Sequence, residues 1–341
     1  MKSLLEMALR LRCWLIAAGL AAALAAQAGT YDPLQIADAP KLSTLDLIVI
    51  DSPRQREIPL RIYLPANNTP APLLLFSHGL GGSRTGNPYL GEHWSARGYF
   101  VVVMQHHGSD EGVWRGMRPD MMLAALKRAA NLDNALLRFA DVSVVIDRLE
   151  KWNRTADLSE KSAEQSALIG RMDLSKIGMS GHSFGAVTAQ AVSGQRSLLG
   201  DARFTDRRIK AAVVMSPSAP EMGDPQQIFA GVNIPWLVMT GTNDVTPSTD
   251  VDVESRRAVY AALPPGNKYE LVLKDAEHNA FGDRALPGEK LPRNPNHHRV
   301  ILALSTAFWD AYLREDVAAK AWLNGPGAAS VLEQKDLWQR K

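Results

Sequence analysis

Cysteine is nearly absent from this chain. Its 341 residues include a single one, Cys13, which lies close to the amino terminus. One thiol cannot form an intramolecular disulfide, and it cannot build a Cys-ligated metal site. Beyond the first residues there is no thiol nucleophile either, so any covalent chemistry must use other side chains.

A charge imbalance is also missing. The chain has 38 Lys and Arg and 36 Asp and Glu, a formal net charge of +2. Removal of residues 1–28 would take away three basic and one acidic residue and leave 35 of each. No basic stripe with interleaved aromatic residues is present, so we expect no nucleic-acid partner.

The amino terminus has the pattern of a secretory signal peptide. Three basic residues precede an apolar run over 13–26, and Ala26-Gln27-Ala28 is a small-x-small cleavage site. The pattern predicts export to the periplasm or the exterior, with no stable membrane insertion after cleavage. An N-terminal membrane anchor is the alternative, although the run is short for a membrane span.

The remaining chain, 29–341, shows no Pro/Gly/Ser-rich linker and no internal repeat, which favours a single domain. Predicted strands cover 45–51, 58–64, 72–77, 99–104, 176–180, 209–215, 235–240 and 269–273, and predicted helices 88–97, 132–152, 186–192, 253–263 and 299–313. Such alternation predicts an α/β fold with a mainly parallel central sheet and helices on both faces. The first two strands would pair antiparallel at one edge.

Two stretches, 108–131 and 154–175, do not fit this alternation. Each lies between predicted elements and could cover the mouth of a site. Each could equally be a surface insertion that packs on its own helix.

The motif Gly181-His182-Ser183-Phe184-Gly185 reads G-x-S-x-G. It stands between a predicted strand and a predicted helix, the setting of a nucleophile elbow. The glycines would keep Cβ atoms out of a turn in which the serine backbone is strained. We therefore predict Ser183 as a nucleophile, the alternative being a plain Gly-rich turn.

A serine nucleophile needs a base and a group that orients the base. His278 follows the last predicted strand, so its loop should lie at the same sheet edge as the elbow. Asp244 follows the strand before it, and the order Ser183, Asp244, His278 is the one expected in an α/β-hydrolase. Asp275 is a competitor for the acid, but we expect it to shape its own loop.

Acyl transfer also needs donors for an oxyanion. The small residues of Ser77-His78-Gly79-Leu80-Gly81-Gly82 follow the strand at 72–77 and would let backbone amides face a cavity. We predict the amides of Leu80 and Phe184 as these donors. His78 is expected to shape the loop rather than carry a proton.

Trp114, His106 and Met215 come after the carboxyl ends of predicted strands, and we expect them to line the mouth. No metal or cofactor is expected. The acidic run Asp250–Glu254 lacks the glycine and the spacing of a calcium loop, and it is better explained as a solvated helix entry.

These motifs resemble the α/β-hydrolase superfamily, and within it the platelet-activating-factor acetylhydrolases and predicted dienelactone-hydrolase-like proteins. The resemblance is carried by Phe76–Arg84, Trp94–Tyr99, Arg138–Leu149 and Asp173–Ala186. It implies a serine esterase, although dienelactone hydrolases use a cysteine nucleophile. The acetylhydrolases also place their acid after the strand at 209–215, where this chain has none. Asp244 must then serve, as in bacterial cutinases and polyester hydrolases.

The leading hypothesis is a serine carboxylesterase that forms an acyl-enzyme with neutral esters of small or medium acyl groups. A polyester hydrolase of the cutinase type, a peptidase and an acyltransferase are alternatives on the same fold. A non-catalytic binding protein is the alternative of a different class, and such proteins generally lose a triad member.

Overall fold

The computed structural model describes residues 31–36, 43–154, 163–246, 251–283 and 289–341. The predicted signal peptide lies outside the described residues. The sheet is built, in chain order, from β1 (Ser43–Asp51), β2 (Arg56–Leu64), β3 (Ala71–Ser77), β4 (Phe100–Met104), β5 (Met172–His182), β6 (Ile209–Met215), β7 (Trp236–Asn243), β8 (Lys268–Glu277) and β9 (Leu337–Arg340).

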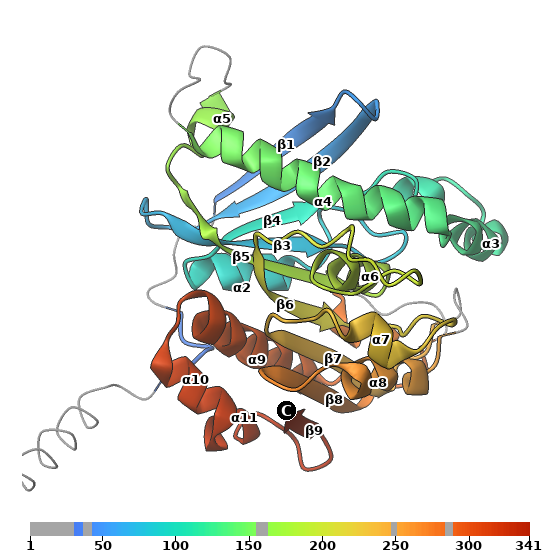
Figure 1. Ribbon diagram of the computed structural model, residues 1–341, viewed down its shortest axis with the longest axis vertical. Coiled ribbons are helices and arrows are strands. Elements are labelled where there is room, and N and C mark those ends of the chain that lie inside the picture. The colour runs from blue at the N-terminus through green and yellow to red at the C-terminus, as the bar shows by residue number, and fades with distance from the viewer. Residues whose placement is uncertain (1–30, 37–42, 155–162, 247–250, 284–288) are drawn as a thin grey trace, which may run out of the picture.

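The strands lie in the order β1-β2-β4-β3-β5-β6-β7-β8-β9 (Figure 1). Strands β4, β3, β5, β6, β7 and β8 are parallel, whereas β1, β2 and β9 add antiparallel pairings at the two edges. This confirms the predicted α/β fold with its mainly parallel sheet. Strand β9 was missed because four partly exposed residues carry no burial pattern.

Two layers of helices cover the sheet. They are α2 (Pro88–Ala96), α3 (Pro119–Ala129), α4 (Leu132–Asn153), α5 (Ala163–Ser166), α6 (Phe184–Val192), α7 (Pro225–Phe229), α8 (Val253–Ala262), α9 (Pro295–Leu313), α10 (Val317–Asn324) and α11 (Pro326–Ala329), with short 3-10 turns η1 (Glu111–Val113) and η2 (His278–Phe281). In the described part of the chain, no helix is both long and apolar enough to cross a membrane.

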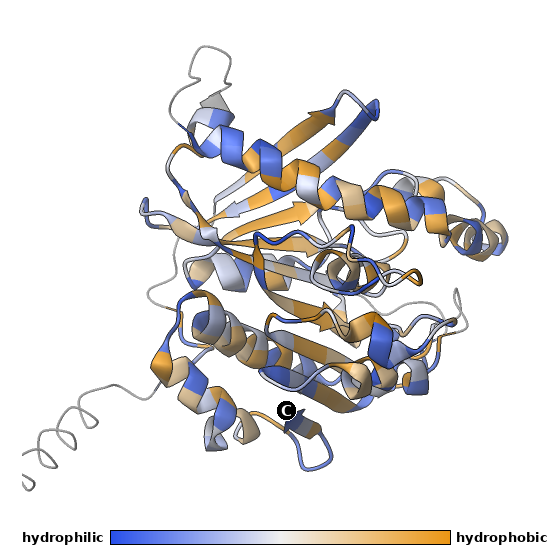
Figure 2. Ribbon diagram, viewed as in Figure 1, coloured by the Kyte–Doolittle hydropathy of each residue, from blue (hydrophilic) through white to orange (hydrophobic). Residues whose placement is uncertain are grey.

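Strand β3 illustrates why the central strands are continuous apolar runs. All seven of its residues are buried. Leu74 and Phe76 pack into the core beneath α2 and α9, whereas Leu73 and Leu75 pack into the core beneath α4 and α6. Figure 2 shows the central strands in the colour of hydrophobic residues. Burying each such side chain stabilises the fold by roughly 2 kcal/mol.

Helix starts follow from capping side chains. Asp252 accepts a hydrogen bond from the Ser255 amide at the start of α8, so residues 251–254 of the acidic run serve as a helix entry, whereas Asp250 lies outside the described residues. Helix α9 begins at Pro295, four residues earlier than predicted. Asn294 caps it, and proline fits the first turn because its missing N–H is not needed there.

The described parts of the two irregular stretches lie at opposite ends of the parallel strands, and residues 155–162 of the second stretch lie outside the described residues. The stretch at 108–131 forms η1 and α3 beside the loop after β3, where Trp114 Nε1 donates to the Gly81 carbonyl at 2.8 Å. Figure 1 shows α5 at the far end of the sheet from α3. There the Arg171 carbonyl accepts from the amide of Ala71, the first residue of β3. Residues 163–175 therefore do not cover the mouth, because the chain must return to the amino edge to start a parallel strand.

Candidate active site

The turn between β5 and α6 holds Ser183 in a rare conformation, with φ 58° and ψ −119°. Its amide donates to the Met215 carbonyl at 2.9 Å, which anchors the turn to the end of β6. A Cβ at Gly181 would overlap the Gly185 carbonyl, and a Cβ at Gly185 would overlap the Ser77 carbonyl. Both glycines are therefore required by close backbone approach, and the strained serine presents its hydroxyl at the carboxyl edge of the sheet.

His278 and Asp244 form a hydrogen-bonded chain with this hydroxyl. His278 Nε2 lies 2.8 Å from Ser183 Oγ, and His278 Nδ1 lies 2.7 Å from Asp244 Oδ1. Asp244 is fully buried at the end of β7, where Thr240 Oγ1 donates to its second carboxyl oxygen at 2.8 Å. The structure thus brings together the three residues that the sequence predicted as nucleophile, acid and base.

The negative charge on Asp244 determines which atom donates in each of these hydrogen bonds. Burial by itself raises the pKa of Asp244, but the hydrogen bond from His278 and the positive charge of Arg256 lower it well below its usual range. An ionised carboxylate only accepts, so His278 Nδ1 carries the proton. The lone pair on Nε2 then faces the Ser183 hydroxyl, as a general base requires.

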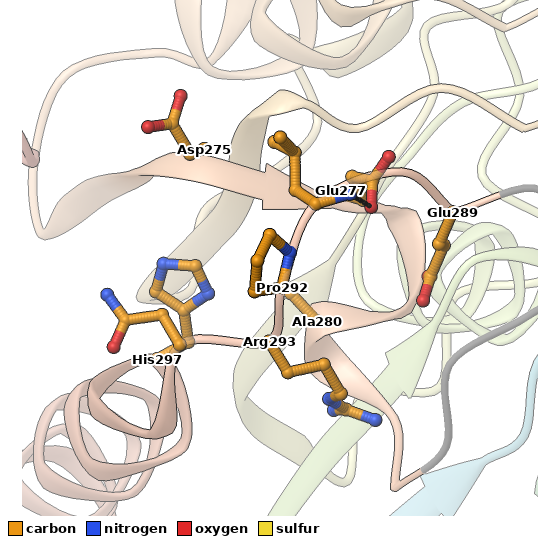
Figure 3. A pocket seen from close by; sticks show the side chains of 9 residues that line it. Asp275, Glu277, Ala280, Glu289, Pro292, Arg293 and His297 are labelled. Atoms are coloured by element: carbon orange, nitrogen blue, oxygen red, sulfur yellow. Dashed lines mark hydrogen bonds between the residues drawn. The ribbon is translucent and has the colours of Figure 1, made fainter.

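Asp275 does not reach the base. Its side chain is exposed and pairs with Lys274 Nζ at 2.6 Å. Asp275 lines a small cavity of about 20 Å³ behind the His278 turn, together with Glu277, Glu289 and Arg293 (Figure 3). Asp244 Oδ1 lies 2.7 Å from His278 Nδ1, so the geometry favours Asp244 as the partner of the imidazole.

His182, the residue directly before Ser183 in G-x-S-x-G, contacts the turn that carries His278. Its Nε2 lies 3.0 Å from the His278 carbonyl, and the two rings are 4.8 Å apart. Burial and the neighbouring His278 lower the pKa of His182 to about 3. A neutral His182 can therefore donate Nε2–H to that carbonyl and hold the turn in place.

The loop after β3 lies against the nucleophile. A Cβ at Gly79 would come within 3.5 Å of Ser183 Cβ. Leu80 follows directly, and Phe184 is the first residue of α6. In the part of the chain that the structure describes, neither amide donates to a backbone acceptor. Both are therefore free to donate to a group bound at Ser183.

Of the three residues predicted to line the mouth, Trp114 alone has some exposure. His106 is fully buried, with Nε2 3.0 Å from Ser77 Oγ and Nδ1 2.9 Å from Asp141 Oδ2. Met215 is also fully buried and packs in the core beneath α9. The prediction for His106 and Met215 was wrong, because residues at a strand end can still point under the covering helices.

Sequence reasoning missed Arg256. This α8 residue is 2 % exposed, and its Nε lies 2.9 Å from Asp244 Oδ1. Its Nη1 donates to the Ser216 and Pro217 carbonyls at 2.8 and 3.0 Å, at the place where the resemblance would put an acid. The signal was its position on the buried stripe of the helix with Val259 and Tyr260, where a charge needs a partner.

The described residues include no group of three His, Cys, Asp or Glu side chains placed to hold a metal ion. The arrangement places a serine hydroxyl, an imidazole and a carboxylate in one hydrogen-bonded chain. Together these groups can carry out acyl transfer.

One segment of the chain matches the model of a known family. Residues 59–113 match the family model of platelet-activating factor acetylhydrolase, isoform II. No curated protein matches the chain. Among the 886 solved chains that match, a ferulic acid esterase from Streptomyces cinnamoneus has 21% sequence identity and a TM-score of 0.56. The alignment covers 84% of this chain and 94% of that one.

At this level of identity the solved structure establishes the fold, which is that of the α/β-hydrolases. The family match lies on the segment that includes β3 and the Gly-rich loop beside Ser183. The chain thus has the α/β-hydrolase fold, and part of it is similar to the platelet-activating factor acetylhydrolases.

Proposed function

We propose that this protein is a serine esterase in which Ser183 is the nucleophile, His278 the base and Asp244 the orienting acid. The supporting observation is the continuous chain from Asp244 to Ser183 Oγ, with both hydrogen bonds between 2.7 and 2.8 Å. Ser183 lies on the strained turn between β5 and α6. The amides of Leu80 and Phe184 have no backbone acceptor among the described residues, which supports their role as oxyanion donors.

In the first half-reaction, Ser183 Oγ attacks the ester carbonyl and its proton moves to His278 Nε2. The carbonyl oxygen becomes an oxyanion that accepts hydrogen bonds from the amides of Leu80 and Phe184. Collapse of this intermediate breaks the ester C–O bond. The imidazolium protonates the departing alcohol, and an acyl-enzyme remains.

In the second half-reaction, His278 takes a proton from water, which attacks the acyl carbonyl. The oxyanion forms again at the same amides, and the carboxylic acid leaves as Ser183 recovers its proton. Asp244 stays ionised throughout and stabilises the transient imidazolium.

Neutral esters of small or medium acyl groups are the proposed substrates. Trp114 offers an apolar ring beside the Gly-rich loop, where its indole N–H is already used by the Gly81 carbonyl. Esters of aromatic acids are a second candidate class, because the similar solved structure is named a ferulic acid esterase. Polyesters extend the same chemistry to a larger substrate.

The test combines substitution with active-site labelling. Wild-type protein should hydrolyse p-nitrophenyl esters. Comparing the rates for esters of increasing acyl chain length and for a ferulate ester then shows which acyl group is preferred. Ser183→Ala should lower kcat by about 10⁴ to 10⁶ and abolish labelling by a fluorophosphonate, while the melting temperature stays close to wild type. Activity above about a tenth of wild type in this variant would exclude Ser183 as the nucleophile.

Other classes give different outcomes. A peptidase would cleave peptide substrates in preference to esters, and an acyltransferase would pass the acyl group to an added alcohol faster than to water. A non-catalytic binding protein would neither hydrolyse esters nor react with the fluorophosphonate.

We also propose export, supported by the basic, apolar and small-x-small segments of residues 1–28. Protein recovered from the periplasm or medium should begin at Gly29. Intact-mass measurement decides this, and a full-length chain in the membrane fraction would favour the anchor.

A further inference from the structure

Arg138 on α4 is a fully buried arginine whose guanidinium lies beneath the Gly-rich loop. Its Nη1 donates to the His78 carbonyl at 2.8 Å and to Ser77 Oγ at 3.2 Å, and its Nε donates to Ser109 Oγ at 2.8 Å. Within the described residues no carboxylate forms an ion pair with it. Burial lowers the pKa of Arg138 to about 9, so the side chain is still cationic at neutral pH.

The same side chain touches the first residue after the nucleophile. The Arg138 guanidinium carbon lies 4.5 Å from the centre of the Phe184 ring. This is the distance of a cation–π contact, which is strongest when both groups are removed from water. The contact restrains Phe184, whose amide is one of the two proposed oxyanion donors.

His78 connects Arg138 to the other donor, and its hydrogen bonds define its tautomer. The His106 amide donates to His78 Nε2 at 3.1 Å, so Nε2 must carry a lone pair. The ring proton is then on Nδ1, which donates to the Gly79 carbonyl at 2.6 Å. Arg138 Nη2 also lies 3.2 Å from Nδ1, but both atoms then carry protons, so this contact acts through charge and not as a hydrogen bond. Burial and the positive charge of Arg138 lower the pKa of His78 well below its usual value, which agrees with a neutral ring.

The Gly79 carbonyl is the other end of the peptide that carries the Leu80 amide. In a trans peptide the C=O and N–H point in opposite directions, so holding one aims the other. The carbonyl is held by His78 Nδ1–H and by the Gly82 amide at 3.0 Å. His78 thereby fixes the direction of the Leu80 N–H. Arg138 in turn donates a hydrogen bond to the His78 carbonyl.

We propose that Arg138 is a positioning residue for the oxyanion site, because it fixes both amide donors through the His78 carbonyl and the Phe184 ring. This inference rests on the proposed function. It adds that one buried cation, Arg138, aligns the oxyanion donors, although its helix α4 carries none of the three proposed catalytic residues. A lysine could keep the charge, but it could not make the forked contacts to three acceptors and stack on the ring.

The test is Arg138→Lys in the full-length enzyme, with rates expressed per site titrated by a fluorophosphonate. We expect kcat for p-nitrophenyl acetate to fall by about 10- to 100-fold, less than the loss of an entire donor, with KM little changed. Affinity for a trifluoromethyl ketone should fall in parallel. That inhibitor forms a reversible bond to Ser183 and places an anionic oxygen at the two amides, so its affinity reports on the oxyanion site. The acid limb of the pH profile should not move, because the base is untouched.

Arg171→Lys is the matched control. Arg171 also donates to backbone carbonyls, those of Pro65 and Asn67, but it lies at the amino edge of the sheet. We expect its kcat and inhibitor affinity per site to equal those of wild type. Equal values in Arg138→Lys would overturn the proposal.

If Arg138→Lys does not fold, Phe184→Leu decides, since it keeps the amide and removes the ring. A severalfold loss of inhibitor affinity supports the proposal, and an unchanged affinity overturns it. Failure of the proposed function would look different, because wild-type enzyme would then neither react with the fluorophosphonate nor hydrolyse the ester.

Discussion

Two Ser-His-Asp chains occur in this molecule, and they have nearly the same hydrogen-bond geometry. In one the Ser–His and His–Asp distances are 2.8 and 2.7 Å, and in the other they are 3.0 and 2.9 Å. In both, arginine side chains also contact the carboxylate. We call them the outer chain (Ser183, His278, Asp244) and the inner chain (Ser77, His106, Asp141).

The two chains differ in what surrounds the serine. Ser77 is fully buried at the end of β3, and its Oγ already accepts from Arg138. Ser183 is partly exposed on a strained turn, against which the loop after β3 packs. Among the described residues, the amides of Leu80 in that loop and of Phe184 have no backbone acceptor. Hydrogen-bond geometry alone therefore does not define a nucleophile. Access for substrate and donors for an oxyanion must be added to it.

The inner chain has the features of a structural ion cluster. Burial by itself raises the pKa of Asp141, but hydrogen bonds from His106 and Arg56 lower it well below its usual range. Burial and the nearby Arg138 lower the pKa of His106 to about 4. A neutral His106 thus bridges a buried carboxylate to Ser77, and Arg54 and Arg56 tie helix α4 to the first hairpin.

The largest expected difference between the chains is in catalysis. Asp244→Asn should lower kcat by about 10⁴, because the imidazole would hold the wrong tautomer, while ester binding is kept. Asp275→Asn is the control, and it should have little effect because its carboxylate is exposed and paired with Lys274. Steady-state kinetics with one ester measure both. A greater loss in Asp275→Asn than in Asp244→Asn would assign the acid to Asp275.

The inner chain should respond in stability instead. Asp141→Asn removes the charge that neutralises Arg54, Arg56 and their surroundings, and it should cost about 3 kcal/mol in the free energy of unfolding. Urea denaturation at neutral pH measures this, while kcat per titrated site should change by less than about tenfold. A loss of kcat comparable to that of Asp244→Asn would mean that the two chains do not divide their roles.

The same cluster predicts how stability depends on pH. His106 has a lowered pKa in the folded protein, so the unfolded state binds its proton first as the pH falls below about 6.5. Wild-type stability from this group is therefore present above that pH and is lost progressively towards pH 4. The Asp141 contribution is lost at still lower pH, below about 3.9.

The smallest expected effect is that of Arg256 in the outer chain. Its variants test whether Arg256 acts on His278 through its charge or by holding Asp244 in place. Arg256 Nη2 lies 3.2 Å from His278 Nδ1, which already donates to Asp244, so this contact acts through charge. Arg256→Gln removes a positive charge that disfavours the imidazolium. The base should then become protonated more easily, and the acid limb of kcat/KM should move to higher pH.

Arg256→Lys is the matched variant, since lysine keeps the positive charge but lacks the several N–H donors of the guanidinium. The other titratable groups against the ring, Asp244 and the neutral His182, are the same in both variants. A profile that does not move in Arg256→Gln, or that moves to lower pH, would show that Arg256 only holds Asp244 in place.

The sequence by itself determined the features that depend on short stretches of backbone. The central strands are continuous apolar runs because both of their faces are covered. The elbow is fixed by two glycines that no other residue can replace, and the order of Ser183, Asp244 and His278 follows from which strands they succeed. These patterns were enough to name the three residues that the structure brings together.

Only the tertiary structure decided where the side chains at the strand ends point. His106 and His278 both follow a strand, yet one is enclosed beneath α4 and the other reaches the serine. Arg138 and Arg256 gave no local signal of their partners, because those partners lie 29 to 61 and 10 to 40 residues away along the chain. Such pairings depend on sheet register and on helix packing, which are set by contacts summed over the whole domain.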